Sequence, residues 1–184
     1  MAVAGGGALV EVSAGERATC GRTAGGEIRC WGLGPLGLGE PTYRTTPVAA
    51  AAGQPFASLG VGSKHTCGID AGGTAHCWGW NEGGQLGDGT LLPSRTPVEV
   101  PSGPGFVSIV GDIDHGCALD AAGSAACWGS SSIGDGSFSR RLVPTPVSGG
   151  LAFAALTAAS QSTCGLTPSG AAYCWGRNLV GQVG

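Results

Sequence analysis

Apolar residues in this chain fall in short runs and do not follow a helical period. The run from Phe106 to Val110 is bounded by glycine and proline, which is typical of a strand. The chain contains 37 glycines and 11 prolines, and these interrupt every window that could carry an apolar period of about 3.6 residues. The pattern therefore predicts an all-β fold.

Apolar positions also recur at fixed distances from paired cysteines, eleven and eight places before the first member of each pair. The pairs, each with nine residues between its members, are Cys20 and Cys30, Cys67 and Cys77, Cys117 and Cys127, and Cys164 and Cys174. Their first members follow one another at 47, 50 and 47 residues, and a period of about 20–50 residues is typical of a solenoid, propeller or array. We expect a single repeat domain, 1–184, with modules at approximately 1–47, 48–97, 98–146 and 147–184, the last one truncated.

Each cysteine pair encloses the signature of a β-hairpin. The four-residue turns between the pairs have a side-chain oxygen first and glycine fourth, which suits a type I turn followed by a left-handed glycine. These turns begin at Thr23, Asp70, Asp120 and Thr167. If Asp70 pairs with Thr74, counting outward places Cys67 opposite Cys77, at the separation that a disulfide needs. The same count predicts a disulfide in every module.

A Trp-Gly pair directly follows the second cysteine of every module. The tryptophans are Trp31, Trp78, Trp128 and Trp175. Because side chains alternate along a strand, each indole points to the sheet face opposite the cysteine. A stack in which the disulfide of one sheet meets the tryptophan of the next would bury both faces. This arrangement is radial repetition, a β-propeller.

The second module carries a motif that resembles a known family. The run Gly-x-x-His-Thr-Cys-x-x-Asp-x-x-Gly-x-x-x-Cys-Trp-Gly-x-Asn-x-x-Gly-Gln-Leu-Gly-Asp-Gly-Thr, beginning at Gly62, is similar to the regulator of chromosome condensation (alpha-tubulin suppressor-like) repeat. Other modules depart from it, with Ala18 and Ser162 in place of the histidine seen at His65 and His115. The resemblance implies a ring of about seven blades, of which four are present. The paired cysteines resemble the bacterial extracytoplasmic branch of the family.

The ring could be completed in two ways. We expect the chain to be a fragment of a longer protein, because its ends do not resemble the polar caps of terminal repeats. Pairing with a second copy, and therefore self-association, is the alternative.

Charge, hydropathy and cysteine content restrict the classes of partner and the cellular compartment expected for this chain. A net charge of −3 with 11% charged residues provides no basic field for phosphates, so nucleic acid is not an expected partner. There is no apolar run of eighteen residues and hence no expected membrane span. The N-terminus lacks the basic start of a signal peptide. Eight cysteines in one pairing pattern nevertheless indicate an oxidising, extracytoplasmic location, which is secreted, periplasmic or at the cell surface.

The sequence contains few groups suited to catalysis or metal binding. A nucleophile elbow and a phosphate loop are both missing, so we expect no enzyme activity and no cofactor. Zinc is disfavoured because the hairpin places the two sulfurs of each pair against each other. Asp112, Asp114 and His115 could ligate calcium, but a solvated turn is the default interpretation. The histidines are expected to hydrogen-bond neighbouring backbone, and Asp88 and Asp135 to cap turns.

Function is expected in the loops, where the modules differ most. We interpret the chain as a non-enzymatic scaffold that binds a protein or cell-surface ligand through loops 33–46, 80–95 and 130–145. Trp80 has no counterpart in the other modules and is a candidate ligand contact, as are Arg140 and Arg141. Two alternatives stay open: guanine-nucleotide exchange on a small GTPase, which the family resemblance implies, and a structural spacer in a surface repeat array.

Overall fold

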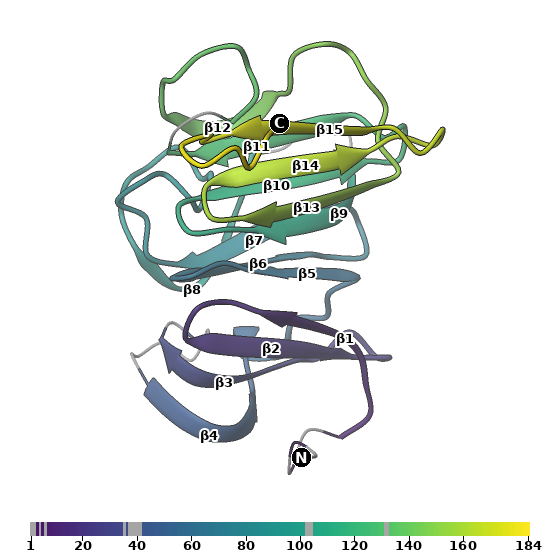
Figure 1. Ribbon diagram of the computed structural model, residues 1–184. Coiled ribbons are helices and arrows are strands. Elements are labelled where there is room, and N and C mark those ends of the chain that lie inside the picture. The colour runs from purple at the N-terminus through teal and green to yellow at the C-terminus, as the bar shows by residue number, and fades with distance from the viewer. Residues whose placement is uncertain are drawn as a thin grey trace.

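The structure is a computed structural model that describes residues 3, 5, 7–34, 36, 42–101, 105–130 and 133–184. The described residues form four antiparallel sheets that stack in chain order (Figure 1). Neighbouring strands within each sheet are consecutive in sequence, so every sheet is a simple meander. The predicted all-β architecture with four propeller blades is confirmed.

The strands divide evenly among the blades, except that the described part of blade 4 contains three. Blade 1 contains β1 (Leu9–Ala14), β2 (Ala18–Thr23), β3 (Ile28–Gly34) and β4 (Thr42–Ala49). A short 3-10 helix, η1 (Ala51–Gly53), leads to blade 2, which contains β5 (Ser58–Val61), β6 (His65–Ile69), β7 (Ala75–Gly79) and β8 (Ser94–Glu99). Blade 3 contains β9 (Phe106–Gly111), β10 (His115–Asp120), β11 (Ala125–Gly129) and β12 (Arg141–Pro146). Blade 4 contains β13 (Ala155–Ala159), β14 (Ser162–Leu166) and β15 (Ala172–Gly176).

The central hairpin of each blade forms as the turn residues predict. In blade 2, Asp70 Oδ1 accepts hydrogen bonds from the backbone N–H groups of Gly72 and Thr74, both at 2.9 Å. Gly73 takes the left-handed conformation with φ +84°, which a side chain would disfavour. Cys67 then lies opposite Cys77. All four predicted disulfides are present, each with 4.1 Å between its Cα atoms.

The blades pack through alternating sulfur and indole. The Cys20–Cys30 disulfide shares a buried cluster with Trp78 of the next blade. The disulfide of blade 2 meets Trp128 in the same way, and that of blade 3 meets Trp175. Trp78 and Trp128 are completely buried as a result. The stacking predicted from strand alternation is therefore confirmed.

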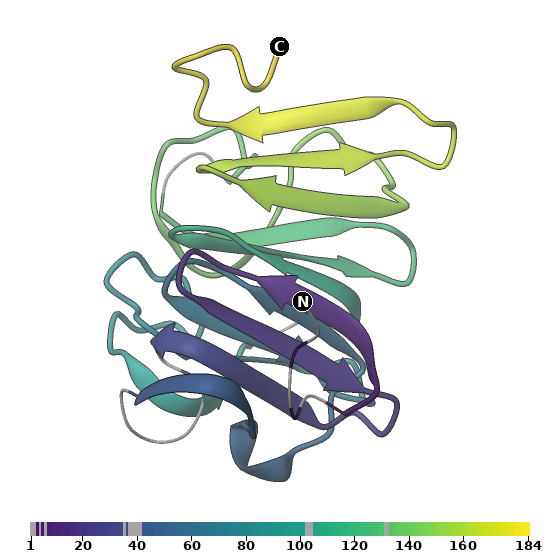
Figure 2. The same cartoon turned by 60° about the horizontal axis from the view of Figure 1, so that its bottom comes forward.

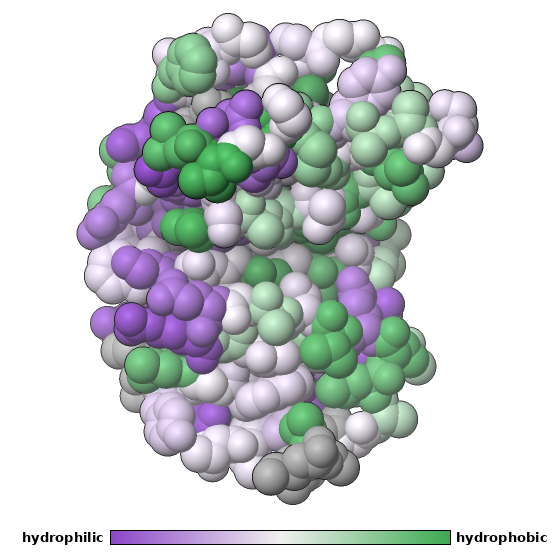
Figure 3. Space-filling model, in the orientation of Figure 1, coloured by the Kyte–Doolittle hydropathy of each residue, from purple (hydrophilic) through white to green (hydrophobic). Residues whose placement is uncertain are grey.

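The two ends of the stack differ from its interior. Figure 2 shows blade 4, coloured yellow-green, at one end with no sheet beyond it. Its disulfide is half-buried, and so is Trp31 on blade 1, whereas their interior equivalents are inaccessible. Hydrophobic surface gathers over β1 and over the segment after β15 (Figure 3). The interior blades thus supply most of the core, and the seven-bladed ring stays a prediction.

The first strands of the blades lie side by side and tie neighbouring sheets together. Glu11 Oε1 on β1 accepts a hydrogen bond from the backbone N–H of Leu59 on β5 at 3.1 Å. Ser13 Oγ accepts one from Val61 N–H at 3.0 Å. Blades 1 and 2 are therefore positioned against each other by polar as well as apolar contacts. Among the described residues, no helix has both the length and the apolar character needed to cross a membrane.

Candidate binding face

The meander topology brings most of the variable segments to one side of the molecule. In a four-stranded meander, the turn between strands one and two and the loop between strands three and four lie at the same end. We call this end, in all four blades together, the loop face. The opposite end, which carries the glycine-containing hairpin turns, is the hairpin face.

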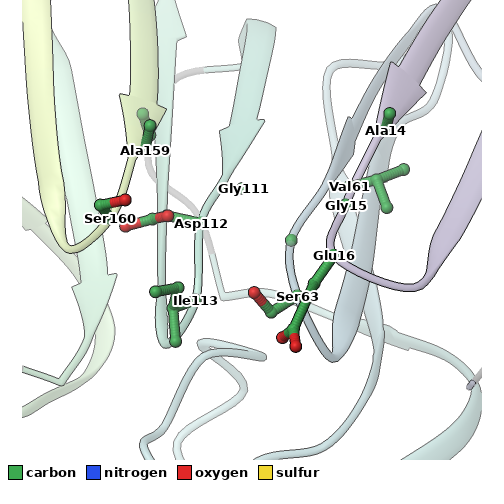
Figure 4. Close-up of a pocket in the computed structure, with 12 residues that line it drawn as sticks. Ala14, Gly15, Glu16, Val61, Ser63, Gly111, Asp112, Ile113, Ala159 and Ser160 are labelled. Atoms are coloured by element: carbon green, nitrogen blue, oxygen red, sulfur yellow. The ribbon is translucent and has the colours of Figure 1, made fainter.

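The inner turns of all four blades meet in a pocket on the loop face, the inner pocket, with a volume of about 360 Å³. Figure 4 shows Glu16 and Ser63 on one side of this pocket and Asp112, Ile113 and Ser160 on the other. Its lining mixes carboxylate, hydroxyl and aliphatic groups. The inner pocket could therefore contact a polar protein segment, but it contains no convergent set of catalytic groups.

Asp112 and Asp114 hold the inner turn of blade 4 against blade 3. Asp112 Oδ2 accepts a hydrogen bond from the backbone N–H of Gln161, and Asp114 Oδ2 accepts one from its side-chain amide at 2.9 Å. Ser160 and Gln161 both have positive φ, at 53° and 68°, so this turn is held in a conformation that is unusual for non-glycine residues. The expectation of a solvated turn at Asp112 is wrong, because its side chain is buried in this contact.

His115 takes part in the same contact. Its Nε2 lies 2.8 Å from Thr163 Oγ1 on β14, and its Nδ1 lies 3.4 Å from Asp112 Oδ2. His76 instead pairs with Asp70 at 3.1 Å. The partners of these histidines are side chains, so the predicted bonds to neighbouring backbone are not what the structure contains. Among the described residues, no group of three or more His, Cys, Asp or Glu side chains is arranged to hold a metal ion.

His65 occupies in blade 2 the position that His115 occupies in blade 3, but it lacks the partners. The residues equivalent to Asp112 and Thr163 are Gly62 and Gly116, which carry no polar side chain. His65 is 1% exposed, and neither ring nitrogen hydrogen-bonds another described residue. Burial, reinforced by repulsion from His115 and only partly offset by Asp114, lowers its pKa from 6.5 to about 4. His65 is therefore a neutral imidazole at physiological pH.

Trp80 lies at a second pocket on the loop face, the outer pocket, between blades 2 and 3. Trp80 is 47% exposed. The ammonium of Lys64 lies 5.5 Å from the ring centroid, a cation–π arrangement. The pocket has a volume of about 290 Å³ and also includes Glu82, Ile113 and Ser130. Trp80 thus forms the wall of a recess, and whether it contacts a ligand stays a prediction.

The loop that carries Trp80 is held firmly by its neighbour Asn81, which is completely buried. The Asn81 amide donates to the backbone oxygens of Thr90 and Leu92, both at 3.1 Å, while its Oδ1 accepts from Leu86 N–H at 2.9 Å. Asp88 caps the following turn, as predicted, by accepting from Thr90 N–H at 2.9 Å. The loop is therefore preorganised.

The next blade also clamps this loop. Trp128 Nε1–H donates to Gln85 O at 3.0 Å, and Leu142 O accepts from Gly89 N–H at 2.8 Å. A Cβ at Gly87 would lie 2.6 Å from Trp128 Cδ1, so this position requires glycine. The first glycine of the Gly-Asp-Gly motif therefore lets the loop pack on the following indole.

Arg140 and Arg141 differ in their availability. Arg141 begins β12, and its guanidinium bonds Asp135 Oδ2 at 2.7 Å within its own blade. Burial works against ionisation of Asp135, but hydrogen bonds from Ser137 and Arg141 outweigh it and lower the pKa of that carboxyl. Arg140 is exposed and lies beside Gly84 of the neighbouring loop. Of the two arginines, Arg140 has the freer side chain for a partner.

The predicted loop boundaries need adjustment. Loop 80–95 ends in β8, which starts at Ser94, and loop 130–145 ends in β12. Residues 131 and 132 lie outside the described residues. In loop 33–46, positions 35 and 37–41 also lie outside them, and β4 starts at Thr42.

Sequence reasoning missed Lys64, Ile113 and Gln161, which belong to the short inner turns and not to the long loops. The short turn at Asp112–His115 was considered only for calcium binding, and the other inner turns carry no distinctive motif. The signal that could have identified them is topological, since the first turns of all propeller blades face the same side.

Sequence comparison identifies the repeat. The profile of the regulator of chromosome condensation (RCC1) repeat matches residues 72–119, and a second profile with the same description matches residues 9–37, 56–85 and 154–182. A search of curated proteins finds no matching sequence.

Several solved structures share the fold. Human WBSCR16 is 19% identical with a TM-score of 0.86 over 96% of this chain and 49% of its own. Prp20p from Saccharomyces cerevisiae, described for its binding properties to Gsp1p and histones, is 18% identical with a TM-score of 0.83 over 95% of this chain and 47% of its own. The ectodomain of the receptor kinase CR4 from Physcomitrella patens is 28% identical with a TM-score of 0.59 over 91% of this chain and 39% of its own. The chain thus spans about half or less of the length of these proteins.

Proposed function

The chain belongs to the regulator of chromosome condensation repeat family, and on that premise we propose that it is a non-enzymatic scaffold that binds a protein ligand through its loop face. The observation that carries this proposal is the placement of Trp80. A half-exposed indole on a loop held by buried hydrogen bonds is a rigid aromatic group at the surface, and such groups are enriched among the residues that dominate binding at protein interfaces. Trp80, Arg140 and the rims of the inner and outer pockets are the proposed contact surface.

Preorganisation supports binding by these loops. The contacts of Asn81 and Trp128 fix the backbone of loop 80–95 before any ligand arrives. Ordering an interface loop on association costs free energy, so a loop that is already fixed retains more of its contact energy as affinity. The strands and hairpins agree among the modules while these loops differ, which is the usual division between scaffold and recognition surface.

The solved relatives support protein binding as the class of function. Prp20p is described for binding Gsp1p and histones, and yeast RCC1 (Prp20) has been solved bound to Kap60. We infer a protein ligand for this chain from the same fold. Guanine-nucleotide exchange rests on the fold alone and is the weaker proposal.

The proposed location is extracytoplasmic. Four disulfides, three of them completely buried, are typical of chains that fold in an oxidising compartment. The resemblance to a receptor-kinase ectodomain, at 28% identity, agrees with such a setting. A protein or other ligand at the cell surface is therefore the proposed partner.

Site-specific photo-cross-linking in the native host tests this function. A photoreactive amino acid at Leu92 or Phe138, both highly exposed on the loop face, should form a covalent adduct with a discrete protein. The same group at Ala71 or Ala122, exposed on the hairpin face, is the matched control and should not form it. Equal adducts from both faces, or adducts from the hairpin face alone, would contradict the proposal.

A further inference from the structure

The floor of the outer pocket is rich in hydrogen-bond acceptors. Gln85 Oε1 accepts a hydrogen bond from Gly83 N–H at 2.8 Å, and Ser130 Oγ lies 3.4 Å from Gly83 O, so each of these oxygens keeps a lone pair for a further donor. A Cβ at Gly83 would lie 2.5 Å from Ser130 Oγ and 3.1 Å from Gln85 Oε1, so glycine is needed for this close approach. The exposed carboxylate of Glu82 adds two further oxygens at the pocket. A ligand group that presents several N–H donors and no acceptor fits this floor.

The walls of the pocket are apolar. Trp80 comes from blade 2 and Ile113 from the inner turn of blade 3, and they are 47% and 42% exposed. Ile113 stands between Asp112 and Asp114, which are both anchored to Gln161, so its backbone is held in place. A side chain with an aliphatic stem and a flat polar head would place its stem against these walls and its head over the floor.

The charges at the pocket favour a cation. Burial disfavours ionisation of Asp114, but His115 and Gln161 beside it outweigh this and lower the pKa of its carboxyl, which is therefore charged at neutral pH. The described lining residues thus include two carboxylates, the exposed Glu82 and the less accessible Asp114, and one cation, Lys64. The position of Lys64 over Trp80 indicates that the indole ring attracts a positive charge.

We infer that the outer pocket accepts an arginine side chain of the partner protein, with its guanidinium against Trp80 and the floor oxygens and its stem against Ile113. This inference rests on the proposed protein-binding function and names the chemistry that the partner contributes. Arginine suits the site better than lysine because its planar head stacks on aromatic rings and offers five donors. Lys64 is then a competitor, since its ammonium repels the incoming guanidinium.

Titration with short peptides tests the inference directly. The probe is the capped tripeptide Gly-Arg-Gly, with binding to the full chain followed by NMR shifts of the backbone amides of residues 80–92, which every variant retains, and of the Trp80 indole N–H where it is present. The neutral analogue Gly-citrulline-Gly has nearly the same shape and should bind about tenfold more weakly or worse, because it loses the cation–π and charge-assisted contacts. Equal binding of the two peptides would overturn the inference.

Three variants sharpen the test. Trp80→Ala should abolish the binding of the arginine peptide, and Glu82→Gln should weaken it. Lys64→Gln should strengthen it by about two- to threefold, because a nearby like charge is removed. A purely structural role for Lys64 would instead leave affinity unchanged or reduce it. Tyr173→Ala removes an aromatic residue on β15 that is 46% exposed and lies outside both the pocket lining and the proposed contact surface, so it is the matched control and should bind like the unaltered chain.

The peptide titration and the cross-linking together distinguish failure of the arginine inference from failure of the proposed binding function. Cross-linking at the loop face together with absent peptide binding would leave the proposed function standing and exclude arginine recognition at this pocket. Selective peptide binding without a cross-linked partner would support the pocket chemistry and count against the scaffold function. An Arg peptide shift that persists in Trp80→Ala would place the interaction elsewhere and overturn the inference.

Discussion

Acidification provides a quantitative test of the blade 2 interface through His65. This ring is buried without a hydrogen-bond partner among the described residues, and its pKa falls from 6.5 to about 4. In the unfolded chain the imidazole takes up a proton near pH 6.5, whereas in the folded chain it does so only near pH 4. The unfolded state therefore binds more protons in this window, and stability is lost as the pH falls from 6.5 towards 4.

The size of the loss follows from the two pKa values. Each pKa unit corresponds to about 1.4 kcal/mol, so His65 alone should lower the free energy of unfolding by about 3 kcal/mol between pH 6.5 and 4. The carboxyls of Asp70, Asp114 and Asp135 have lowered pKa values, so their contribution is lost below their ordinary value of 3.8, under this window. The decline above pH 4 therefore reports mainly on histidine.

Urea unfolding at pH 7, 5.5 and 4.5, followed by tryptophan fluorescence, measures this decline. His65→Leu retains a buried side chain of similar size without a titrating group and should lose most of the pH dependence. His76→Gln, which alters a half-buried histidine of the same blade, is the control and should not reproduce that loss. Parallel decline of the unaltered chain and His65→Leu would refute the assignment.

Three further predictions concern the loop and the disulfides. Gly87→Ala should cost about 2–4 kcal/mol in urea unfolding because of positive φ and a clash with the next indole. Gly89→Ala also has positive φ, but its Cβ would meet only Val143 at an ordinary 3.8 Å, so it should cost about 1 kcal/mol. Asn81→Ala should cost about 2–3 kcal/mol and speed amide exchange throughout its loop; unchanged exchange would contradict its anchoring role. Under limiting reductant, the half-buried Cys164–Cys174 disulfide should be reduced before the three buried disulfides. Alkylation of the freed thiols and mass spectrometry of the peptides would detect this order.

The hairpins and disulfides could be predicted because their determinants are local. Turn chemistry at Asp70 and Gly73 sets the register, and the register places Cys67 opposite Cys77. Because every module has the same pattern, the disulfide face of one blade was predicted to pack against the tryptophan face of the next. Strict alternation of side chains along a strand is enough to indicate that contact from the order of residues alone.

The pockets could not be predicted in the same way, because they depend on how separate blades are placed. Asp112 meets Gln161 across 49 positions, and the outer pocket joins Lys64 to Ile113 of the following blade. Neither pairing has a local signature. The lack of a hydrogen-bond partner for His65 could be predicted only in part. The aligned sequences of the modules show Gly62 where blade 3 has Asp112, but the second missing partner would lie on the next blade.

The most direct test of the account is a count of free thiols in the protein taken from its native host. Alkylation followed by mass spectrometry, with and without reductant, distinguishes paired from free cysteines at every position. Four intact disulfides, each within one module, are expected, as in a stapled propeller that works in an oxidising compartment. Eight free thiols would contradict the account and favour an intracellular adaptor or exchange function.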